Sequence, residues 1–241
     1  MTYKVTVSYD GSYFHGWAKQ PSHTTVQQTI EVALNKLLNK KISIYGSGRT
    51  DSYVHALNQV FSFSYDRQLM DFDNFVIALN NLLQKSIRIK SIKKVNDKFN
   101  ARFNAKSKTY IYVINQGEFD LFHNDYFYNY NKKINIRKIK KAAKLLIGKH
   151  NFLSFSTSTL NDTIRTINYI KISKKQNNVL IKVNGNGFLR NQVRMIVGSL
   201  LDFNEDKKTL DDFKNLLKNP QKGSCITKAP GCGLYLYKVE Y

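Results

Sequence analysis

The sequence has few of the residues and segments that mark several classes of protein. Its two cysteines, Cys225 and Cys232, have six residues between them, which fits neither a disulfide framework nor the paired cysteines of a structural zinc site. With 3 prolines and 12 glycines, the chain is neither proline-rich nor collagen-like. No apolar run approaches the ~20 residues of a membrane helix, and the first residues alternate like a strand instead of forming the apolar block of a signal peptide. We therefore expect a cytoplasmic protein with no membrane segment.

Acidic residues are also scarce. The chain carries 17 Asp and Glu against 38 Lys and Arg, a formal net charge of +21. Such an excess favours a polyanionic partner, because each neutralised phosphate releases a condensed counterion. However, 30 of the basic residues are lysine, and asparagine and isoleucine are abundant, a composition that an A- and T-rich genome also produces. The charge alone therefore leaves open a nucleic acid, an anionic membrane surface or neither.

Hydrophobic periodicity predicts an α+β protein. In the first half, alternating apolar residues predict strands and helical spacing predicts helices, in the order strand, helix, strand, strand, helix, strand. This is the order of a ferredoxin-like unit. The expected strands cover residues 3–9, 42–45, 61–65 and 87–95, and the expected helices cover 26–38, capped by Thr24 or Thr25, and 72–83.

The second half repeats this theme with additions. Strands are expected at 110–114, 164–174, 178–184 and 233–241, and helices at 135–147, 188–203 and 209–218. We therefore predict two ferredoxin-like, RRM-like halves, 1–104 and 105–241. If their sheets join edge to edge, they form an extended mixed, mainly antiparallel sheet flanked by helices, with a central cleft. Only the order of elements supports a duplication, since the similarity between the halves is weak.

The first candidate functional segment, Gly46–His55, follows a predicted strand. Its glycines allow a tight backbone excursion that would present Arg49 and Asp51 together. A neighbouring arginine keeps a carboxylate ionised, and an ionised, desolvated carboxylate can act as a nucleophile or a general base. The alternative is a turn in which Asp51 makes only a structural salt bridge. His55 could line the same site, although a hydrogen-bonded structural histidine is the simpler interpretation.

The second segment, residues 101–110, alternates basic and aromatic residues as it enters a strand. Tyr110 or Tyr112 could stack on an unpaired base, an interaction worth about 1–3 kcal/mol. The alternative is that Tyr110 packs in the core like other strand tyrosines. Three basic side chains could contact phosphates: Arg102, Lys106 and Lys108.

The third segment, Gly185–Gly198, opens a predicted helix. Arg190 and Arg194 are four residues apart, so they would share one helix face near the positive end of the helix dipole, where anions bind. The alternative is two unconnected surface arginines.

The sequence Gly48-Arg49-Thr50-Asp51, followed by Val54-His55-Ala56, resembles the active-site motif of the tRNA pseudouridine synthase A family. The resemblance follows the order of the family's motifs along the chain, from residue 3 to residue 241. A chance match in order over this length is very improbable, so the functional interpretation of each segment is favoured. The other matching motifs are Tyr9-Asp10-Gly11-Ser12 with Phe14, Gly16 and Trp17; Ala101-Arg102-Phe103; Lys108-Thr109-Tyr110; Phe188; Val193-Arg194; Ile196–Leu200; and Gly233–Leu236.

This resemblance implies an isomerase that converts uridine to pseudouridine in the anticodon stem-loop of tRNA. Asp51 would attack the flipped nucleotide or first remove its 2′ proton, and Arg49 would hold the carboxylate. Tyr110 would stack on the extruded uracil, and Arg194 would pair with Asp51 in a cleft between the halves. The reaction involves no redox change or group transfer, so no cofactor is expected. No metal is expected either, because the five histidines lack metal-ligand spacing.

The resemblance also implies substrate contacts and an assembly. Leu234 would form part of the apolar wall of the cleft. The family is a homodimer that places tRNA across both subunits, so tRNA and a second copy of the chain are the expected partners. The other expected substrate-binding residues are Thr50, His55, Arg102, Lys108 and Arg190.

Two residues depart from the family pattern. Tyr53 stands where the family usually has glycine, which implies either a shifted backbone or a different cleft wall. Ala18 replaces a glutamine that usually follows Trp17, which implies altered RNA contacts. Neither is one of the residues expected to carry the reaction, so catalysis is expected to survive.

Two other functions remain as alternatives. The first is a non-catalytic module that binds structured RNA, although stacking and phosphate binding do not require a buried acid. The second is an N-glycosidase, which would need a further carboxylate to activate water, and the matching motifs supply none for that role.

Overall fold

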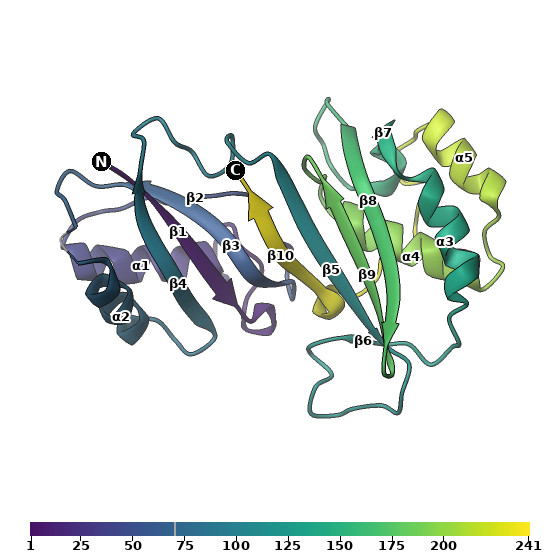
Figure 1. The fold of residues 1–241 in the computed structure, drawn as a ribbon, viewed down its shortest axis with the longest axis horizontal. Coiled ribbons are helices and arrows are strands. Elements are labelled where there is room, and N and C mark those ends of the chain that lie inside the picture. Colours follow the sequence, from purple (N-terminus) through teal and green to yellow (C-terminus); the bar gives the residue numbers. More distant parts are fainter. Residues whose placement is uncertain (70) are drawn as a thin grey trace. The chain divides into compact units, whose positions relative to one another are not determined.

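The computed structural model describes residues 1–69 and 71–241. Within them the chain forms two compact units, Met1–Lys106 with Tyr235–Tyr241, and Ser107–Leu234. Each unit combines mostly antiparallel strands with helices (Figure 1). The α+β class predicted from the sequence is therefore confirmed. No helix in the described part of the chain is both long and apolar enough to cross a lipid bilayer.

The elements of the first unit are β1 (Thr2–Tyr9), η1 (Gly11–Tyr13), α1 (Val26–Leu38), β2 (Tyr45–Gly46), β3 (His55–Ser64), α2 (Phe72–Leu82), β4 (Ile87–Val95) and β10 (Leu234–Glu240). Their strands lie in the order β4-β1-β3-β10. β1 is antiparallel to both β3 and β4, whereas β10 adds to β3 in parallel, with Tyr235 opposite His55. The short strand β2 pairs with the other end of β3.

The core of the first unit is built on β1. β1 pairs with a strand on each edge, and the alternate side chains of one of its faces, from Tyr3 to Tyr9, are buried. Ile30 and Leu34 of α1 and Leu79 of α2 are fully buried. The two helices contact each other, and α2 packs along β4. The hydrophobic periodicity of the two helices therefore correctly predicted that Ile30, Leu34 and Leu79 are buried.

Strand direction gathers three loops at one end of this sheet. Because β1 is antiparallel to both neighbours, its end at Tyr9 lies beside the start of β3 at His55 and the start of β4 at Ile87. Three segments are connected to these strand ends and therefore lie near one another: 10–14, 47–54 and 83–86. This end of the sheet carries the first candidate functional segment.

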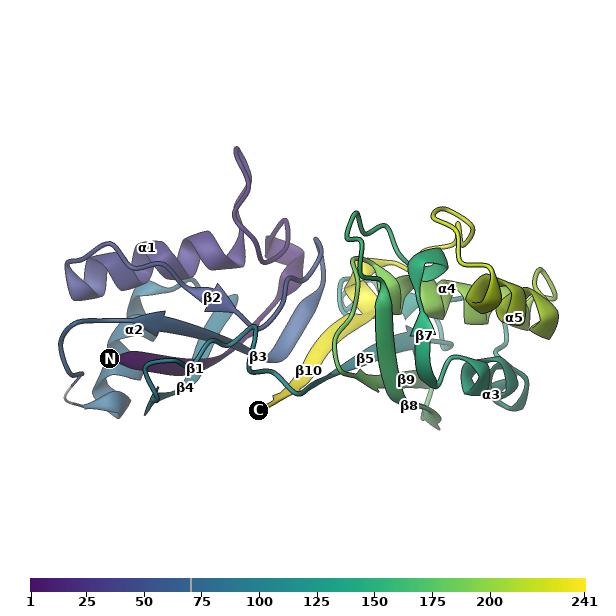
Figure 2. The same cartoon turned by 90° about the horizontal axis from the view of Figure 1, so that it is seen from above.

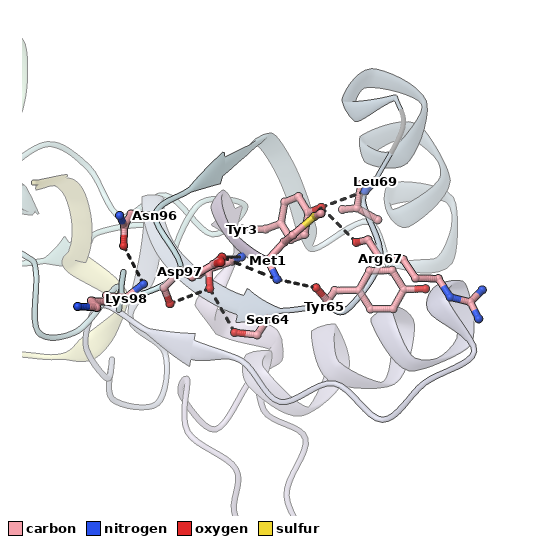
Figure 3. Close-up of polar contacts among 10 residues, drawn as sticks. Met1, Tyr3, Ser64, Tyr65, Arg67, Leu69, Asn96, Asp97 and Lys98 are labelled. Atoms are coloured by element: carbon pink, nitrogen blue, oxygen red, sulfur yellow. Dashed lines mark hydrogen bonds and ion pairs between the residues drawn. The ribbon is translucent and has the colours of Figure 1, made fainter.

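The opposite end of the sheet ties down the start of β1 (Figure 3). The Thr2 backbone nitrogen donates to Oδ1 of Asp97 at 2.9 Å, and the Thr2 hydroxyl donates to the Asp97 carbonyl at 3.1 Å. The Tyr3 hydroxyl accepts from the Leu69 nitrogen at 2.9 Å and donates to the Arg67 carbonyl at 3.3 Å. Tyr9 follows Tyr3 by six residues along the strand, a distance of about 20 Å.

The segment between η1 and α1 rises away from the sheet as a narrow hairpin (Figure 2). A bridge between Gln20 and His23 closes it, and the rings of His15 and His23 stack with centroids 4.4 Å apart. Thr25 occupies the N-cap position of α1, but its side chain makes no capping hydrogen bond. The predicted boundary of the helix is therefore right, and the predicted capping interaction is wrong.

The strand predicted at 42–45 is reduced to two residues, Tyr45–Gly46. The preceding backbone bonds to side chains of α1 instead of to a strand, as shown by the Ile44 nitrogen, which donates to Oε1 of Glu31 at 3.1 Å. The segment has the apolar alternation of a strand, but its backbone is hydrogen-bonded to side chains of a helix.

The strand predicted at 61–65 extends in fact from His55 to Ser64. It is also more deeply covered than its phenylalanine–serine alternation indicated. Ser62 is buried, and its hydroxyl accepts a hydrogen bond from the Ala101 nitrogen at 3.1 Å. A polar residue is stable on the covered face here because it has this partner.

The elements of the second unit are β5 (Ser107–Asn115), β6 (Tyr128–Asn129), α3 (Ile136–Leu145), β7 (Gly148–Asn151), η2 (Leu153–Phe155), β8 (Ile164–Lys175), β9 (Asn178–Gly185), α4 (Gln192–Asn204), α5 (Leu210–Lys218) and η3 (Gly231–Gly233). Their strands lie in the order β5-β9-β8-β7, and β6 adds to β5 in parallel. Helix α3 contacts α4, α5 and β8, so the three helices form one group beside the sheet (Figure 1).

Helix α4 is buried along most of its length, with Arg194 only half-buried. It begins at Gln192, four residues later than predicted, because Asn191 adopts a left-handed conformation with φ 63°. Arg190 therefore lies in the turn before the helix. The prediction that Arg190 and Arg194 share a helix face is wrong.

Both cysteines are free thiols, as expected. Cys225 is buried, and its Sγ lies 2.7 Å from the Ser199 hydroxyl. Cys232 is half-buried, and its Sγ donates to the Phe127 carbonyl at 3.4 Å. Burial raises the pKa of both thiols, so both are held in the unreactive protonated form.

Candidate active site

The loop between β2 and β3 carries Arg49, Thr50 and Asp51 at the end of the first unit's sheet. Its backbone is fixed through Thr50. The Thr50 hydroxyl and the Tyr9 hydroxyl are 2.9 Å apart, and both side chains are buried. The Thr50 carbonyl accepts a hydrogen bond from the Trp17 nitrogen at 3.1 Å. Burial raises the pKa of Tyr9 well above its ordinary value, so its phenol stays protonated.

Two glycines allow neighbouring segments to approach this loop closely. A Cβ on Gly16, which has φ 89°, would lie 2.6 Å from the Thr50 carbonyl oxygen. A Cβ on Gly11 would lie 2.2 Å from the Val54 carbonyl oxygen. No side chain fits at either position without moving the backbone. The two glycines of the opening motif therefore have a structural reason, which is contact with the loop that carries Asp51.

Gln59 is a further support of the loop, and it was not singled out in the sequence. Its buried amide accepts from the Ser47 hydroxyl at 2.6 Å and donates to the Gly48 carbonyl at 3.0 Å. The sequence did contain a signal for its burial, because Gln59 falls in the same alternating register as Phe61 and Phe63. A polar residue at such a buried position needs partners, and here the loop supplies them.

Asp51 itself is half-buried, and Arg49 is exposed. The Val54 nitrogen donates to the Asp51 carbonyl at 3.2 Å, which closes a turn immediately after the acid. The backbone of Asp51 is thus held on both sides, by the Thr50 contacts and by this turn. A carboxylate on such a fixed backbone, still open to solvent in part, can act on a bound substrate as a nucleophile or a base.

His55 is 2% exposed and has neighbours on both sides of its ring. Its Nδ1 accepts from the Gly11 nitrogen at 3.1 Å and lies 3.2 Å from Oδ1 of Asp10. The ring stacks on Tyr235 of β10 with centroids 4.7 Å apart. These contacts join η1, β3 and β10, and they leave almost none of the ring for a ligand.

Tyr53 follows Asp51 by two residues and has φ 64°. This left-handed conformation costs a non-glycine residue about 1–2 kcal/mol. The side chain is 53% exposed, so the tyrosine is accommodated by pointing into solvent while its backbone keeps the conformation that glycine adopts freely.

Arg102 is the predicted site residue of the first unit that lies away from this loop. It is exposed in the turn after β4, and its nitrogen donates to Oδ1 of Asn100 at 2.9 Å. The neighbouring Ala101 is hydrogen-bonded to Ser62, which is seven residues, or about 23 Å, along β3 from His55. The first unit therefore brings Arg49, Thr50, Asp51 and His55 together, but not Arg102.

In the second unit, Tyr110 and Lys108 lie on β5 and pair with β9. Tyr110 is 7% exposed, and its ring meets Phe188 edge-on with centroids 5.3 Å apart. Tyr112, the alternative stacking residue, is fully buried, and its hydroxyl donates to the Pro230 carbonyl at 2.8 Å. Of the two tyrosines, only Tyr110 retains any exposed surface.

Arg194 lies on the first turn of α4 and is held by its neighbours. Its Nε donates to the Ala229 carbonyl at 2.8 Å, and its NH1 donates to Oδ1 of Asn191 at 3.3 Å. In return, the Ala229 nitrogen donates to the Arg194 carbonyl at 3.1 Å. The guanidinium is therefore oriented, in contrast to Arg190, which is exposed.

Leu234 is 5% exposed at the start of β10, directly after η3. The preceding Gly233 lies against β5, since a Cβ there would be 2.7 Å from the ring of Tyr112. Among the described residues, no group of three His, Cys, Asp or Glu side chains is placed to hold a metal ion.

The sequence of this chain is similar to those of known proteins. A family model described as tRNA pseudouridine synthase matches residues 5–104 and 142–241. A protein named tRNA pseudouridine synthase A from Malacoplasma penetrans is 52% identical over 245 residues and covers all of both chains. One of the same name from Ureaplasma parvum is 48% identical over 244 residues, again over all of both chains.

One solved structure also resembles the chain. It is described as an H/ACA RNP bound to a substrate RNA containing 2′-deoxyuridine, with 12% sequence identity and a TM-score of 0.38. The match covers 96% of this chain and 59% of that chain. A likeness this weak supports no conclusion.

Proposed function

This chain belongs to the tRNA pseudouridine synthase family, isomerases that act on tRNA, and we propose that Asp51 is the residue through which it converts uridine to pseudouridine. The observation that carries the proposal is the loop of Asp51. Buried groups fix the backbone on either side of the acid, while Asp51 itself is only half-buried. Such preorganisation is what a reacting carboxylate requires.

The reaction breaks the bond between uracil N1 and ribose C1′ and forms a bond between C5 and C1′. The hydrogen on C5 leaves as a proton and N1 gains one, so atoms and electrons balance without an oxidant or a cofactor. Asp51 would either bond to the ribose or remove its 2′ proton to start the cleavage. Both routes require the nucleotide to be turned out of its stack.

The remaining expected residues complete this proposal. Arg49 is exposed and forms no ion pair with a described residue, so it would hold the carboxylate only once the RNA is bound, or fill the space left by the flipped base. Tyr110 would stack on the extruded uracil, and Leu234 would provide an apolar contact. Arg194, with its guanidinium already oriented by Ala229 and Asn191, would keep an acid ionised during the reaction.

We further propose that the substrate is the anticodon stem-loop of tRNA, bound by a homodimer in the cytoplasm. The net charge of +21 supports a polyanionic substrate. Arg102, Lys108 and Arg190 would serve this long-range attraction. Structured RNA is recognised mainly through shape and phosphate contacts, for which exposed cations suffice.

The test uses unmodified tRNA that carries tritium at uracil C5, since isomerisation releases this label into water. We expect release with the wild type and none with Asp51→Asn, which should still bind the tRNA. Asp73→Asn, an exposed aspartate on α2, serves as the matched control and should release tritium normally. The mass of the RNA must also remain unchanged.

Other outcomes identify the alternatives. Binding without release at any wild-type concentration would indicate a non-catalytic RNA-binding module. Loss of a base from the RNA would indicate an N-glycosidase. Normal release by Asp51→Asn would overturn the assignment of Asp51.

A further inference from the structure

Tyr53 combines a strained backbone with an unused side chain. Its φ of 64° is an outlier for a bulky residue. The ring is 53% exposed, and the side chain makes no hydrogen bond or ring contact with any residue that the structure describes. No side-chain contact with a described residue therefore compensates for the strain. Strain of this kind persists where surrounding contacts determine the backbone, and it is concentrated at functional sites.

The surrounding contacts fix Tyr53 relative to Asp51. The turn closed by Val54 and Asp51 spans it, and its nitrogen lies 3.5 Å from the Phe14 carbonyl. A Cβ on Gly11 would lie 2.9 Å from its carbonyl carbon, so η1 presses against it from the other side. The Cα atoms of residues two apart lie within about 7 Å. The ring is therefore presented close to the carboxylate, on the same rigid loop.

The exposed surface at this end of the sheet suits single-stranded RNA. Tyr13 on η1 is 65% exposed and belongs to the segment that contacts Tyr53. Arg49 lies on the same loop, Lys85 precedes β4 by two residues, and Arg88 of β4 lies opposite Ser8 near the end of β1. These three cations are exposed and form no ion pair with a described residue. Aromatic rings among unpaired cations are the usual composition of a surface that binds single-stranded nucleic acid.

We propose that Tyr53 stacks on an unpaired base of the RNA substrate, next to the nucleotide that reaches Asp51. The part of this proposal that names the neighbouring nucleotide rests on the proposed role of Asp51. Stacking needs only a planar ring held in place, which the strained backbone and its fixed neighbours provide. Tyr53 would thus favour RNA with a looped-out segment over a fully paired helix, and it would act on binding more than on the chemical step.

The experiment compares Tyr53→Gly, Tyr53→Phe and the wild type in binding to an unmodified tRNA hairpin and to a paired RNA of equal length. Loss of one stacked base corresponds to a decrease in affinity of about 5- to 140-fold. We expect this decrease for Tyr53→Gly with the hairpin only, together with a raised KM and a kcat within about twofold of wild type. Tyr53→Phe keeps the ring and should bind within about twofold of wild type.

Stability and binding should change in opposite directions if Tyr53 stacks on RNA, whereas they should fall together if Tyr53 has only a structural role. Tyr53→Gly relieves the positive φ, so it should unfold at a higher urea concentration than wild type while binding RNA more weakly. Gln176→Gly is the matched control: Gln176 is exposed in the β8–β9 turn with φ 52°. It should also gain stability and leave RNA affinity unchanged.

Three results would decide against stacking. These are wild-type affinity for the hairpin in Tyr53→Gly, an equal loss for the paired RNA, or an equal loss in Tyr53→Phe. The proposal is separable from the reaction. If the wild type releases no tritium but its binding still depends on Tyr53, the assignment of the reaction fails and the stacking role stands. If release depends on Asp51 but hairpin binding does not depend on Tyr53, only the stacking role fails.

Discussion

Replacing Tyr9 with phenylalanine tests whether the contact between Tyr9 and Thr50 positions the loop of Asp51. The two hydroxyls are 2.9 Å apart and buried. The variant removes one oxygen and keeps the ring in place. It therefore changes the support of the loop without removing apolar surface.

The expected loss of stability follows from the burial of both groups. A neutral hydrogen bond contributes about 0.5–1.5 kcal/mol net, and a buried hydroxyl left without its partner adds to the loss. We therefore expect Tyr9→Phe and Thr50→Val each to lower the free energy of unfolding by about 1–2 kcal/mol. The double variant leaves neither hydroxyl unsatisfied, so its loss should be smaller than the sum by about 1 kcal/mol.

Urea unfolding measures these energies, and tritium release measures the effect on catalysis. If the contact positions Asp51, Tyr9→Phe should lower kcat by up to about 100-fold and leave tRNA binding intact. Tyr3→Phe is the matched control, because it removes a buried, hydrogen-bonded hydroxyl from the same strand about 20 Å away (Figure 3). It should lose similar stability and keep kcat. Additive single variants, or an equal fall in kcat in Tyr3→Phe, would refute the positioning role.

Two other outcomes are expected. Hydrogen bonds from Lys132, Tyr130 and Lys207 lower the pKa of Glu205 from 4.5 to about 2, so its contribution is fully present above pH 4.5 and is lost as the pH falls toward 2. Acid titration of the unfolding free energy should therefore be flatter in Glu205→Gln than in wild type, and parallel curves would contradict this. Affinity for tRNA should fall steeply with salt, and a log–log slope shallower than about −2 would mean that the basic surface neutralises few phosphates.

The sequence predicted the elements whose hydrogen bonds are local or follow a regular pattern. Strand β4 was expected at 87–95 and is found there, since its alternation needs no information beyond the strand itself. The beginning of α4 could not be predicted in this way. It depends on the left-handed Asn191, which a helical pattern of apolar residues does not reveal. The shortening of β2 depends in turn on Glu31, a residue of a distant helix.

In the candidate site, too, local features could be predicted from the sequence and long-range contacts could not. Glycines and the Arg-Thr-Asp sequence identified the loop, because a backbone excursion with an acid is a local feature. The support of the loop is not local. Gln59 and Tyr9 come from two different strands, and their importance depends on which loop covers them. Prediction from sequence therefore identified the side chain expected to react, but not the groups that hold it.

These supports also explain how Tyr53 can remain in an unfavourable conformation. The loop is anchored before it by the Thr50 contacts and after it by His55 and the strand, so relaxing φ at Tyr53 would break several hydrogen bonds. Relaxing φ would gain about 1–2 kcal/mol, and losing those contacts would cost more, so the strain is tolerated. It follows that the effects of Tyr9→Phe and Tyr53→Gly on stability should not be additive. Weakening the anchor lets the loop relax, and the benefit of glycine at position 53 then becomes smaller.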